Sequence, residues 1–407
     1  MRALKLLILL STPGVLSLFG QAQVPANSLD LKTVLALAES SNLELRAARQ
    51  QRAVSLAGIK VAGQLPNPTL SFSAARDTPH ESVLWDQPLE LGGKRSKRIA
   101  VANEELKATE IDIGVLGRQI RHRTRDAFYK ALLSRAQALQ SKAALDLSTR
   151  IRDAVRQRFD AGDVAELEVI QAEVEVARSG TDYESATQTQ KIADAQLAVL
   201  LNQPLDRPPD LKGLVEELPT VETLAALSDR VLHTNTEVLR TTQELAIEER
   251  RLSLARSQRI PNLDLQAGVD LNSPGEFDVG PRGQIGITLP LFNHGQGEIA
   301  QSSARLELLR LSLQALRNNA QVQVFAAYFD YVAKARQADQ YKNAIVPQTS
   351  KLEEMAEESY RAGKINLLTL IDSQRRLNET RKTYLDSLFA VQSAFSTLEE
   401  TVGTPLD

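Results

Sequence analysis

Strict alternation of apolar and polar residues marks the strands of this chain. Between residues 263 and 271 every second residue is apolar or alanine, with Asp264, Gln266 and Asp270 among the residues between them. The stretches 283–291 and 69–75 alternate in the same way, whereas 83–91 alternates poorly. This pattern predicts four strands that share one apolar face. That face is expected to carry Leu70, Phe72, Leu265, Val269, Ile285 and Ile287.

Long helix-forming stretches separate these strands. At about 1.5 Å per residue, the two longest would each extend on the order of 100 Å. Rods of that length do not fit a compact globular domain, so the helices are expected to pack side by side as an elongated bundle. We expect helices over 31–63, 94–160, 164–201, 221–258, 297–361 and 365–402.

The order of elements repeats at an interval of about two hundred residues. Arg-Phe-Asp-Ala-Gly ending at Gly162 matches Ser-Tyr-Arg-Ala-Gly ending at Gly363, an offset of 201 residues. Each glycine follows a long helix, where a left-handed cap favours glycine. We therefore expect a turn between two helices at each position. The predicted organisation is a first repeat over 23–203, a proline-containing linker over 204–220 and a second repeat over 221–407.

The first residues and the composition restrict the compartment and the chemistry. Basic residues followed by a short apolar run and Gly20-Gln21-Ala22 predict a secretory signal peptide over 1–22. The chain has no cysteine, which excludes disulfides and thiolate chemistry. With 48 basic and 51 acidic residues, its formal charge is −3, so it has no excess of positive charge that would bind nucleic acid.

Strands with one apolar and one polar face fit an outer-membrane barrel, although a soluble, half-buried sheet would show the same alternation. The barrel is favoured because the helices offer no apolar surplus to cover such a sheet. Backbone groups in lipid must be paired, so the sheet must close, and the smallest membrane barrels have about 8 strands. Four strands per chain therefore require several copies. A homotrimer with a 12-stranded barrel and a surrounding bundle of long helices is the simplest closed assembly.

Three segments of the chain resemble the TolC-type outer-membrane efflux proteins. Residues 31–49 are similar to that family's opening helix, with Asn42-Leu43 where the family has Asn-Pro. Residues 87–102 resemble the strand-to-helix entry of its heavy-metal-resistance (cobalt-zinc-cadmium) branch, and 360–372 resemble the turn at the periplasmic tip. The resemblance covers essentially the whole chain after the signal peptide. It implies a mainly α protein with a trimeric transmembrane β-barrel and a long α-helical barrel.

The resemblance also implies a function and partners. Such proteins are outer-membrane ducts whose periplasmic helices form a tunnel, and whose tip docks a periplasmic adaptor and an inner-membrane pump. The tip, marked here by Gly162, Tyr360 and Gly363, is narrowed in the family by acidic rings. One acidic position falls on Asp372, the second falls on Thr369, and the first repeat offers Glu168.

Asp372 at the tip, and a proline further back in the same half of the chain, each have two possible explanations. Three copies of Asp372 around a narrow axis would attract cations, but a solvated helix residue beside Arg375 and Arg376 would look the same in sequence. Pro347 removes a backbone hydrogen bond inside a predicted helix and must kink or break it. That kink either helps the tube to taper or is merely tolerated.

No catalytic, cofactor or metal site is expected. His80, His122, His233 and His294 are far apart in sequence and lack the spacing of a zinc site. Gly92-Gly93-Lys94-Arg95 lacks the spacer of a phosphate loop and is interpreted as a strand-to-helix turn. The leading hypothesis is an efflux duct for small solutes, with heavy-metal cations suggested. The alternatives are a periplasmic coiled-coil adaptor or scaffold, and a type I duct for protein secretion.

Overall fold

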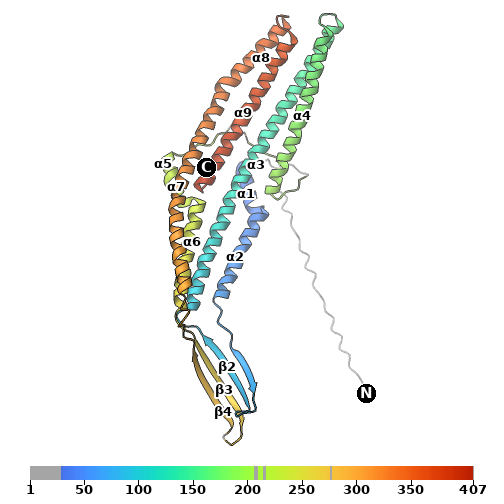
Figure 1. Cartoon of the computed structure of the whole chain (residues 1–407). Coiled ribbons are helices and arrows are strands. Elements are labelled where there is room, and N and C mark those ends of the chain that lie inside the picture. Colours follow the sequence, from blue (N-terminus) through green and yellow to red (C-terminus); the bar gives the residue numbers. More distant parts are fainter. Residues whose placement is uncertain (1–28, 206–209, 214–216, 276, 407) are drawn as a thin grey trace, which may run out of the picture.

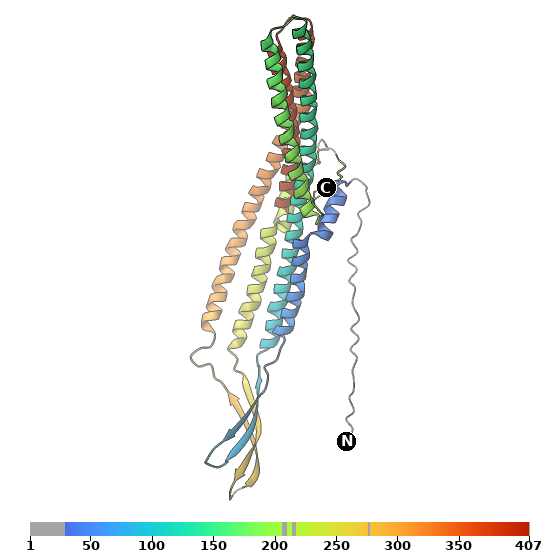
Figure 2. The ribbon, with the colours of Figure 1, turned by 90° about the vertical axis from the view of Figure 1, so that its right-hand side faces the viewer.

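The chain folds as an elongated protein, with helices along most of its length and a sheet at one end (Figure 1). The computed structural model describes residues 29–205, 210–213, 217–275 and 277–406. The predicted signal peptide, and residues 206–209 and 214–216 of the predicted linker, lie outside the described residues. The view turned by 90° shows the same succession of long helices above a twisted sheet (Figure 2).

The helices of the two halves follow the same order. In the first half, a short helix and a medium helix precede the sheet, and two long helices follow the first strand pair: α1 (Leu31–Ser41), α2 (Leu43–Ala62), α3 (Lys94–Asp160) and α4 (Glu166–Leu200). The second half repeats this with α5 (Leu224–Thr234), α6 (Thr236–Gln258), α7 (Gln296–Gln340), the π-helix η1 (Tyr341–Ile345), α8 (Val346–Arg361) and α9 (Leu367–Val402).

The helices expected over 31–63 and 221–258 are each broken once, a correction to the sequence-based expectation. Asn42 and Asn235 have extended backbones and begin α2 and α6 as N-caps. Asn42 accepts a hydrogen bond from the Leu45 backbone N–H at 3.2 Å. An asparagine at this position satisfies an orphan helix donor but interrupts the preceding helix. Both breaks could have been predicted from the sequence, because each asparagine begins a repeated motif.

The four strands form one antiparallel sheet in the order β1 (Thr69–Ala74), β2 (Glu81–Leu89), β3 (Leu263–Ser273) and β4 (Phe277–Ile287). β2 pairs with β3 although almost two hundred residues separate them, so the two halves share one sheet. The register places Val83 opposite Val269 and Leu265 opposite Ile285. The outer strands β1 and β4 each have one edge that no described strand of this chain covers.

The position expected for the fourth strand, 283–291, is wrong at both ends. β4 begins at Phe277 and ends at Ile287, and residues 288–291 lie beyond the ladder. The strand begins earlier because the alternation also holds for Val279 and Pro281, which pair with Leu271 and Val269. Proline is tolerated here because β4 is the edge strand of the chain.

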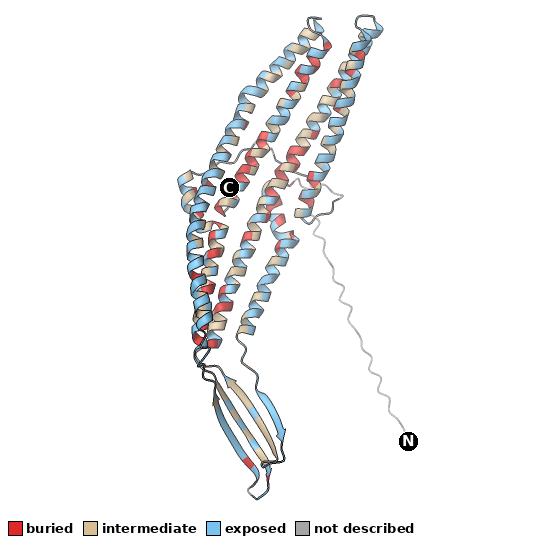
Figure 3. Cartoon of the chain, viewed as in Figure 1, coloured by how far each residue is buried: buried red, intermediate tan, exposed pale blue. Residues whose placement is uncertain are grey.

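The apolar cores lie among the helices and leave the sheet uncovered, as the burial colouring shows (Figure 3). The largest cluster joins α1, α3, α4, α7 and α9 around Phe128, Leu197 and Phe395, each at most 1% exposed. A second cluster around Val324 and Leu398 joins α5, α6, α7 and α9. A third cluster holds α3, α4 and α9 together near the helical turns through Val155, Val169, Ala172, Leu367, Leu370 and Ile371.

Candidate channel surfaces

One face of the sheet is apolar over most of its width, with Glu81 and Gln87 of β2 as polar members. Residues directly opposite in an antiparallel pair point to the same side. The register therefore places Leu70 beside Trp85, Trp85 beside Ala267, and Leu265 beside Ile285 on a single face. None of the described helices covers this face (Figure 3). The residues predicted to contact lipid are all on it, with exposed fractions of 76% for Leu70, 66% for Phe72, 47% for Leu265, 37% for Val269, 72% for Ile285 and 52% for Ile287.

The opposite face of the sheet is polar and acidic. Gln266 lies between Asp86 on β2 and Gln284 on β4. Four carboxylates share this face with one arginine, and Arg282 contacts Asp270 at 3.7 Å. A polar face opposite an apolar face of this extent is the arrangement expected when lipid lies on one side and water on the other. The acidic residues are Asp86, Asp264, Asp270 and Asp278.

Two helices at the edges of the lower bundle carry exposed stripes. The helices lie in the order α2, α3, α6, α7, so α2 and α7 form the outer edges (Figure 1). On each, exposed residues recur at alternating spacings of three and four, the spacing of a coiled-coil seam. The α2 stripe is Leu43, Ala47, Gln50, Val54, Ala57 and Val61, and the α7 stripe is Leu308, Leu311, Ala315, Asn318, Val322, Phe325 and Phe329.

The two glycine turns at the far end of the helices have the same hydrogen-bond pattern. Gly162 has φ of 84° and Gly363 has φ of 69°. The Asp163 N–H donates to the Arg158 carbonyl at 2.9 Å, and the Lys364 N–H donates to the Ser359 carbonyl at 2.9 Å. These are the closing bonds of a Schellman motif, which terminates a helix and reverses the chain. Each turn therefore joins two antiparallel helices into a hairpin.

Polar contacts join the two hairpins close to these turns. The Tyr360 hydroxyl donates to Glu168 Oε2 at 3.4 Å, and the Arg158 guanidinium lies 5.5 Å from the Tyr360 ring centre. Burial raises the pKa of Tyr360, and the Glu168 carboxylate adds to that shift. Further along, Arg375 Nε donates to Glu175 Oε2 at 3.1 Å, and this bond raises the pKa of Arg375. The tip is thus held by contacts from α3, α4, α8 and α9.

The two acidic residues predicted at the tip have different surroundings. Asp372 is exposed on α9, one turn from Arg375. Glu168 is half-buried and bonded to Tyr360, so it holds one hairpin against the other. The structure does not bring Asp372 and Glu168 into one cluster within a chain. Their role as a pore constriction stays a prediction.

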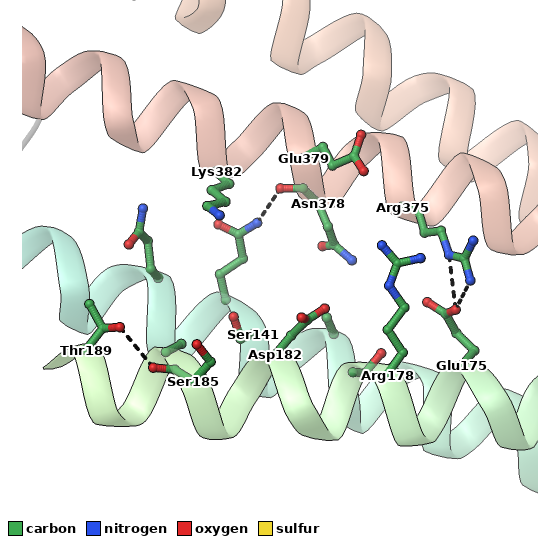
Figure 4. A pocket seen from close by; sticks show the side chains of 15 residues that line it. Ser141, Glu175, Arg178, Asp182, Ser185, Thr189, Arg375, Asn378, Glu379 and Lys382 are labelled. Atoms are coloured by element: carbon green, nitrogen blue, oxygen red, sulfur yellow. Dashed lines mark hydrogen bonds and ion pairs between the residues drawn. The ribbon is translucent and has the colours of Figure 1, made fainter.

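A polar groove of about 390 Å³ lies between α3, α4 and α9 (Figure 4). Arg178 and Asp182 line its α4 side, and Glu379 and Lys382 line its α9 side. Gln140 crosses the groove and donates to the Asn378 carbonyl at 2.7 Å. Its lining is balanced in charge, so the groove does not favour a strongly charged small ligand.

The histidines do not form a metal site with other residues that the structure describes. No group of three or more histidine, aspartate or glutamate side chains in the described ranges could hold a metal ion. His122 bonds to the Ser396 hydroxyl, and its Nε2 lies 3.4 Å from Glu400. Burial is the main cause of the raised pKa of the neighbouring Asp126. Among the described helices, none is long and apolar enough to cross a membrane.

Comparison with known proteins identifies this architecture. The family model described as outer membrane efflux protein matches residues 34–203 and 227–404, one stretch in each half of the chain. The chain belongs to the outer membrane efflux protein family. It is therefore an outer-membrane efflux channel and not an enzyme, and the adaptor or scaffold alternative is set aside.

Relatives of this efflux protein cover most of its length. The cobalt-zinc-cadmium resistance protein CzcC of Cupriavidus metallidurans is 24% identical over 93% of this chain and 91% of its own length. The pyoverdine export outer membrane protein OpmQ of Pseudomonas aeruginosa is 26% identical over 82% of this chain and 69% of its own length.

Solved channel structures share the fold. The CusC structure superposes with a TM-score of 0.75 at 18% identity, covering 92% of each chain. The outer membrane protein VceC of Vibrio cholerae gives a TM-score of 0.74 at 15% identity, over 93% of this chain and 97% of that one. These likenesses confirm the predicted fold class of long helices with a four-stranded contribution to a barrel.

Polar contacts at mid-length, which were not predicted from the sequence, tie short helices to long ones. The Ser41 hydroxyl donates to the Leu201 carbonyl at 2.8 Å, and Asn42 Nδ2 donates to the Leu200 carbonyl at 3.2 Å. In the second half, Asn235 Nδ2 donates to the Thr401 carbonyl at 3.0 Å, and the Thr234 hydroxyl also bonds the end of α9. Each pair of hydrogen bonds ties the end of a short helix to the C-terminus of a long one. The repeated asparagines were the available signal.

Proposed function

We propose that three copies of this chain close into one duct. The strands form a 12-stranded barrel in the outer membrane, and the helices continue it as a tunnel through the periplasm. The uncovered edges of the sheet carry this proposal. β1 and β4 each leave backbone groups without a strand partner in the described chain, and backbone groups in lipid must be paired. Pairing β4 of one copy with β1 of the next satisfies both edges.

The helix edges support the same closure. The exposed stripes of α2 and α7 lie at opposite edges of one layer, where they face the corresponding edges of neighbouring copies in a ring. Nearer the turns, α4 exposes Leu167 and Val174 at 63% and 60%, and α8 exposes Met355 at 57%. Apolar rows at coiled-coil spacing fit knobs-into-holes packing between copies. Closure would bury them in the assembled tunnel.

The tip is the end at which the duct would meet its partners. It is formed by the turns at Gly162 and Gly363, at the opposite end of the molecule from the sheet (Figure 1). We propose that it docks a periplasmic adaptor and, through the adaptor, an inner-membrane pump. Contacts between the hairpins at Tyr360–Glu168 and Arg375–Glu175 would have to rearrange when the tip widens.

Divalent metal cations are the cargo that the chain supports best. CzcC, whose name refers to cobalt, zinc and cadmium, matches over 93% of this chain. The polar face of the sheet has four carboxylates against one arginine, and Asp372 is exposed on the tip helix α9. A lumen with excess negative charge favours cations without a dedicated binding cage. No feature of the described residues specifically favours a protein cargo.

The assembly is tested by the mass of the detergent-extracted protein from separated outer membranes. We expect three chains per particle in the outer-membrane fraction. A monomer or dimer would contradict the closed barrel. A variant gives a second test. Leu265→Asp would place a carboxylate in lipid and should impair trimer formation, because it costs up to about a few kcal/mol of assembly free energy near the midplane. Normal assembly of that variant would mean that the apolar face does not contact lipid.

The cargo is tested separately, on trimers that have passed the first test. Planar-bilayer recordings should show that Asp372→Asn lowers the preference for cations, because it removes three carboxylates from the proposed ring. Asp182→Asn, in the polar groove between α3, α4 and α9, is the matched control and should leave the reversal potential unchanged. An unchanged reversal potential in Asp372→Asn would show that this residue does not line the pore.

A measurement on cells tests the cargo directly. Cells lacking the channel should accumulate zinc or cobalt, and unchanged accumulation would argue against metal cargo.

A further inference from the structure

The four connections between sheet and helices meet in a narrow band of the molecule. They comprise residues 60–68, 88–98, 255–262 and 288–298, and we refer to them as the junction. Contacts hold them together: Lys94 Nζ donates to Asn262 Oδ1 at 2.5 Å, and Arg95 Nε donates to the Gly63 carbonyl at 2.6 Å. A Cβ added to Gly92 would lie only 2.7 Å from Ile260 Cδ1. The junction is therefore one packed layer, at the boundary between sheet and helices (Figure 1).

This layer is strongly basic, in contrast to the rest of the chain. It contains seven lysines and arginines against two glutamates, whereas the whole chain has a formal charge of −3. Glu90 is neutralised within the layer, since Arg98 Nη2 donates to it at 2.8 Å. The basic residues are Lys60, Lys94, Arg95, Lys97, Arg98, Arg256 and Arg259.

Favourable interactions with helix dipoles explain only some of these basic residues. Lys60 and Arg256 lie in the last turns of α2 and α6, where the helix dipole favours a cation. Lys94, Arg95 and Lys97 lie in the first turn of α3, where the dipole disfavours one. Contacts to the Asn262 side chain and to the Gly63 and Ser253 carbonyls fix their positions, and the nearby Glu90 offsets only part of the positive charge of the layer. An anion outside the chain would offset it.

An exposed apolar collar adjoins these basic residues. Leu289 and Leu291 continue the alternation of the apolar sheet face past the end of β4, with exposed fractions of 59% and 73%. Phe292 is 93% exposed, and Leu65 on the first connection is 64% exposed. Apolar side chains followed directly by cations match the boundary of a lipid layer, where acyl chains give way to headgroup phosphates.

We infer that the junction binds the phosphate headgroups of anionic phospholipids in the periplasmic leaflet. The inference rests on the proposed membrane insertion of the sheet, because only then does the junction lie at that leaflet. Lys60, Arg256 and Arg259 are the exposed cations that reach the lipid, and among the described residues none forms an ion pair or hydrogen bond with their side chains. Arg95 and Arg98 hold the underlying layer together through the end of α2.

The single tryptophan provides the measurement. Trp85 lies on the apolar sheet face and is 54% exposed. The full-length protein is reconstituted in phosphatidylcholine vesicles containing a minority of phosphatidylglycerol, with brominated acyl chains on one lipid or the other. Bromine quenches tryptophan fluorescence on contact. We expect quenching per brominated phosphatidylglycerol to exceed that per brominated phosphatidylcholine about threefold, and this excess to vanish near 1 M salt, where the screening length is about 3 Å.

A triple variant and a matched control assign the effect to the junction. Lys60→Gln, Arg256→Gln and Arg259→Gln together should abolish the preference for phosphatidylglycerol. Lys142→Gln, Lys191→Gln and Lys351→Gln, which remove the same charge from exposed helix positions away from the sheet, should retain it. Equal quenching by both lipids in the unmodified protein, or a preference that survives the triple variant, would overturn the inference. Absence of quenching by either lipid would instead contradict the membrane insertion of the sheet.

Discussion

The two long arms of the molecule have equivalent places in the repeat but differ in continuity and packing. In the first half, α3 is an unbroken helix of 67 residues with many buried side chains. In the second half, the corresponding arm is divided into α7, the π-helix η1 and α8, and neither η1 nor α8 has a fully buried residue. The first arm is thus the anchored one, and the second carries a discontinuity on the way to the tip.

Pro347 explains where the second arm is interrupted. It is the second residue of α8, which begins where η1 ends. A proline cannot donate the backbone hydrogen bond that a continuing α-helix needs, and a π-turn accommodates the resulting mismatch. The expected kink or break at Pro347 takes the form of a local change in hydrogen bonding, because the helical backbone continues from η1 into α8. Local openings are expected where few buried contacts hold a segment, so the α8 side of the tip should move before the α3 side.

The largest effect is expected when a proline is placed in the first arm and removed from the second. Asp146 on α3 occupies the place of Pro347, at the repeat offset of 201, and is exposed. Asp146→Pro should destabilise the trimer by about 3 kcal/mol, because it breaks a helix whose neighbours are packed. Pro347→Ala should change stability little. Thermal unfolding of both variants in detergent would measure the difference, and equal shifts would show that the arms are equally tolerant.

Substituting the tip glycines tests whether the turns themselves are equivalent. Gly162→Ala and Gly363→Ala each place a Cβ in a left-handed conformation, which costs about 1–2 kcal/mol. Apart from the adjoining residues, no described residue has an atom within 4 Å of the added Cβ at either position, so backbone strain is the expected cost. Similar losses in thermal stability would show that the arms differ through packing alone. A much larger loss at one glycine would place a further contact there in the trimer.

Weakening the contact between hairpins should affect the less anchored side. Tyr360→Phe removes the hydroxyl that bonds Glu168 at 3.4 Å and keeps the ring against Arg158. A loss of about 1 kcal/mol is expected for one such bond, together with more frequent opening events in bilayer recordings. Tyr183→Phe on α4 serves as control. If Tyr360→Phe recordings match those of the unmodified protein, this bond does not restrain the tip.

The smallest expected effect concerns Glu353 on α8. Burial and the nearby Glu357 raise the pKa of this carboxyl. A raised folded-state pKa means that its contribution to stability is present below the unfolded pKa and is lost as pH rises through the folded pKa. Glu353→Gln should therefore raise the melting temperature slightly at neutral pH, with a smaller difference at pH 4. An equal gain at both values would assign the effect to packing, and no gain would contradict the shift.

Local sequence patterns predicted most of the helices, strands and turns. Alternation at 263–271 predicted the face that carries Leu265 and Val269, because a strand places every second side chain on one side. The glycines at 162 and 363 marked reversals, since a left-handed cap is a local requirement. The end of β4 was misplaced because Leu289 and Leu291 continue the alternation while the hydrogen-bonded ladder stops at Ile287. Periodicity reports the environment of side chains and cannot report backbone pairing.

Tertiary structure decided how distant segments meet. The pairing of β2 with β3 joins the two halves in one sheet, and the bond between Tyr360 and Glu168 joins two hairpins across 192 residues of sequence. The basic junction also emerges only when four connections gather in one layer. Such groupings depend on register and on packing between long helices, both of which are set by contacts remote in sequence. By itself, the sequence determined most of the helices and strands, because those depend on periods and turns within a few residues, and its resemblance to a known family indicated the class of channel.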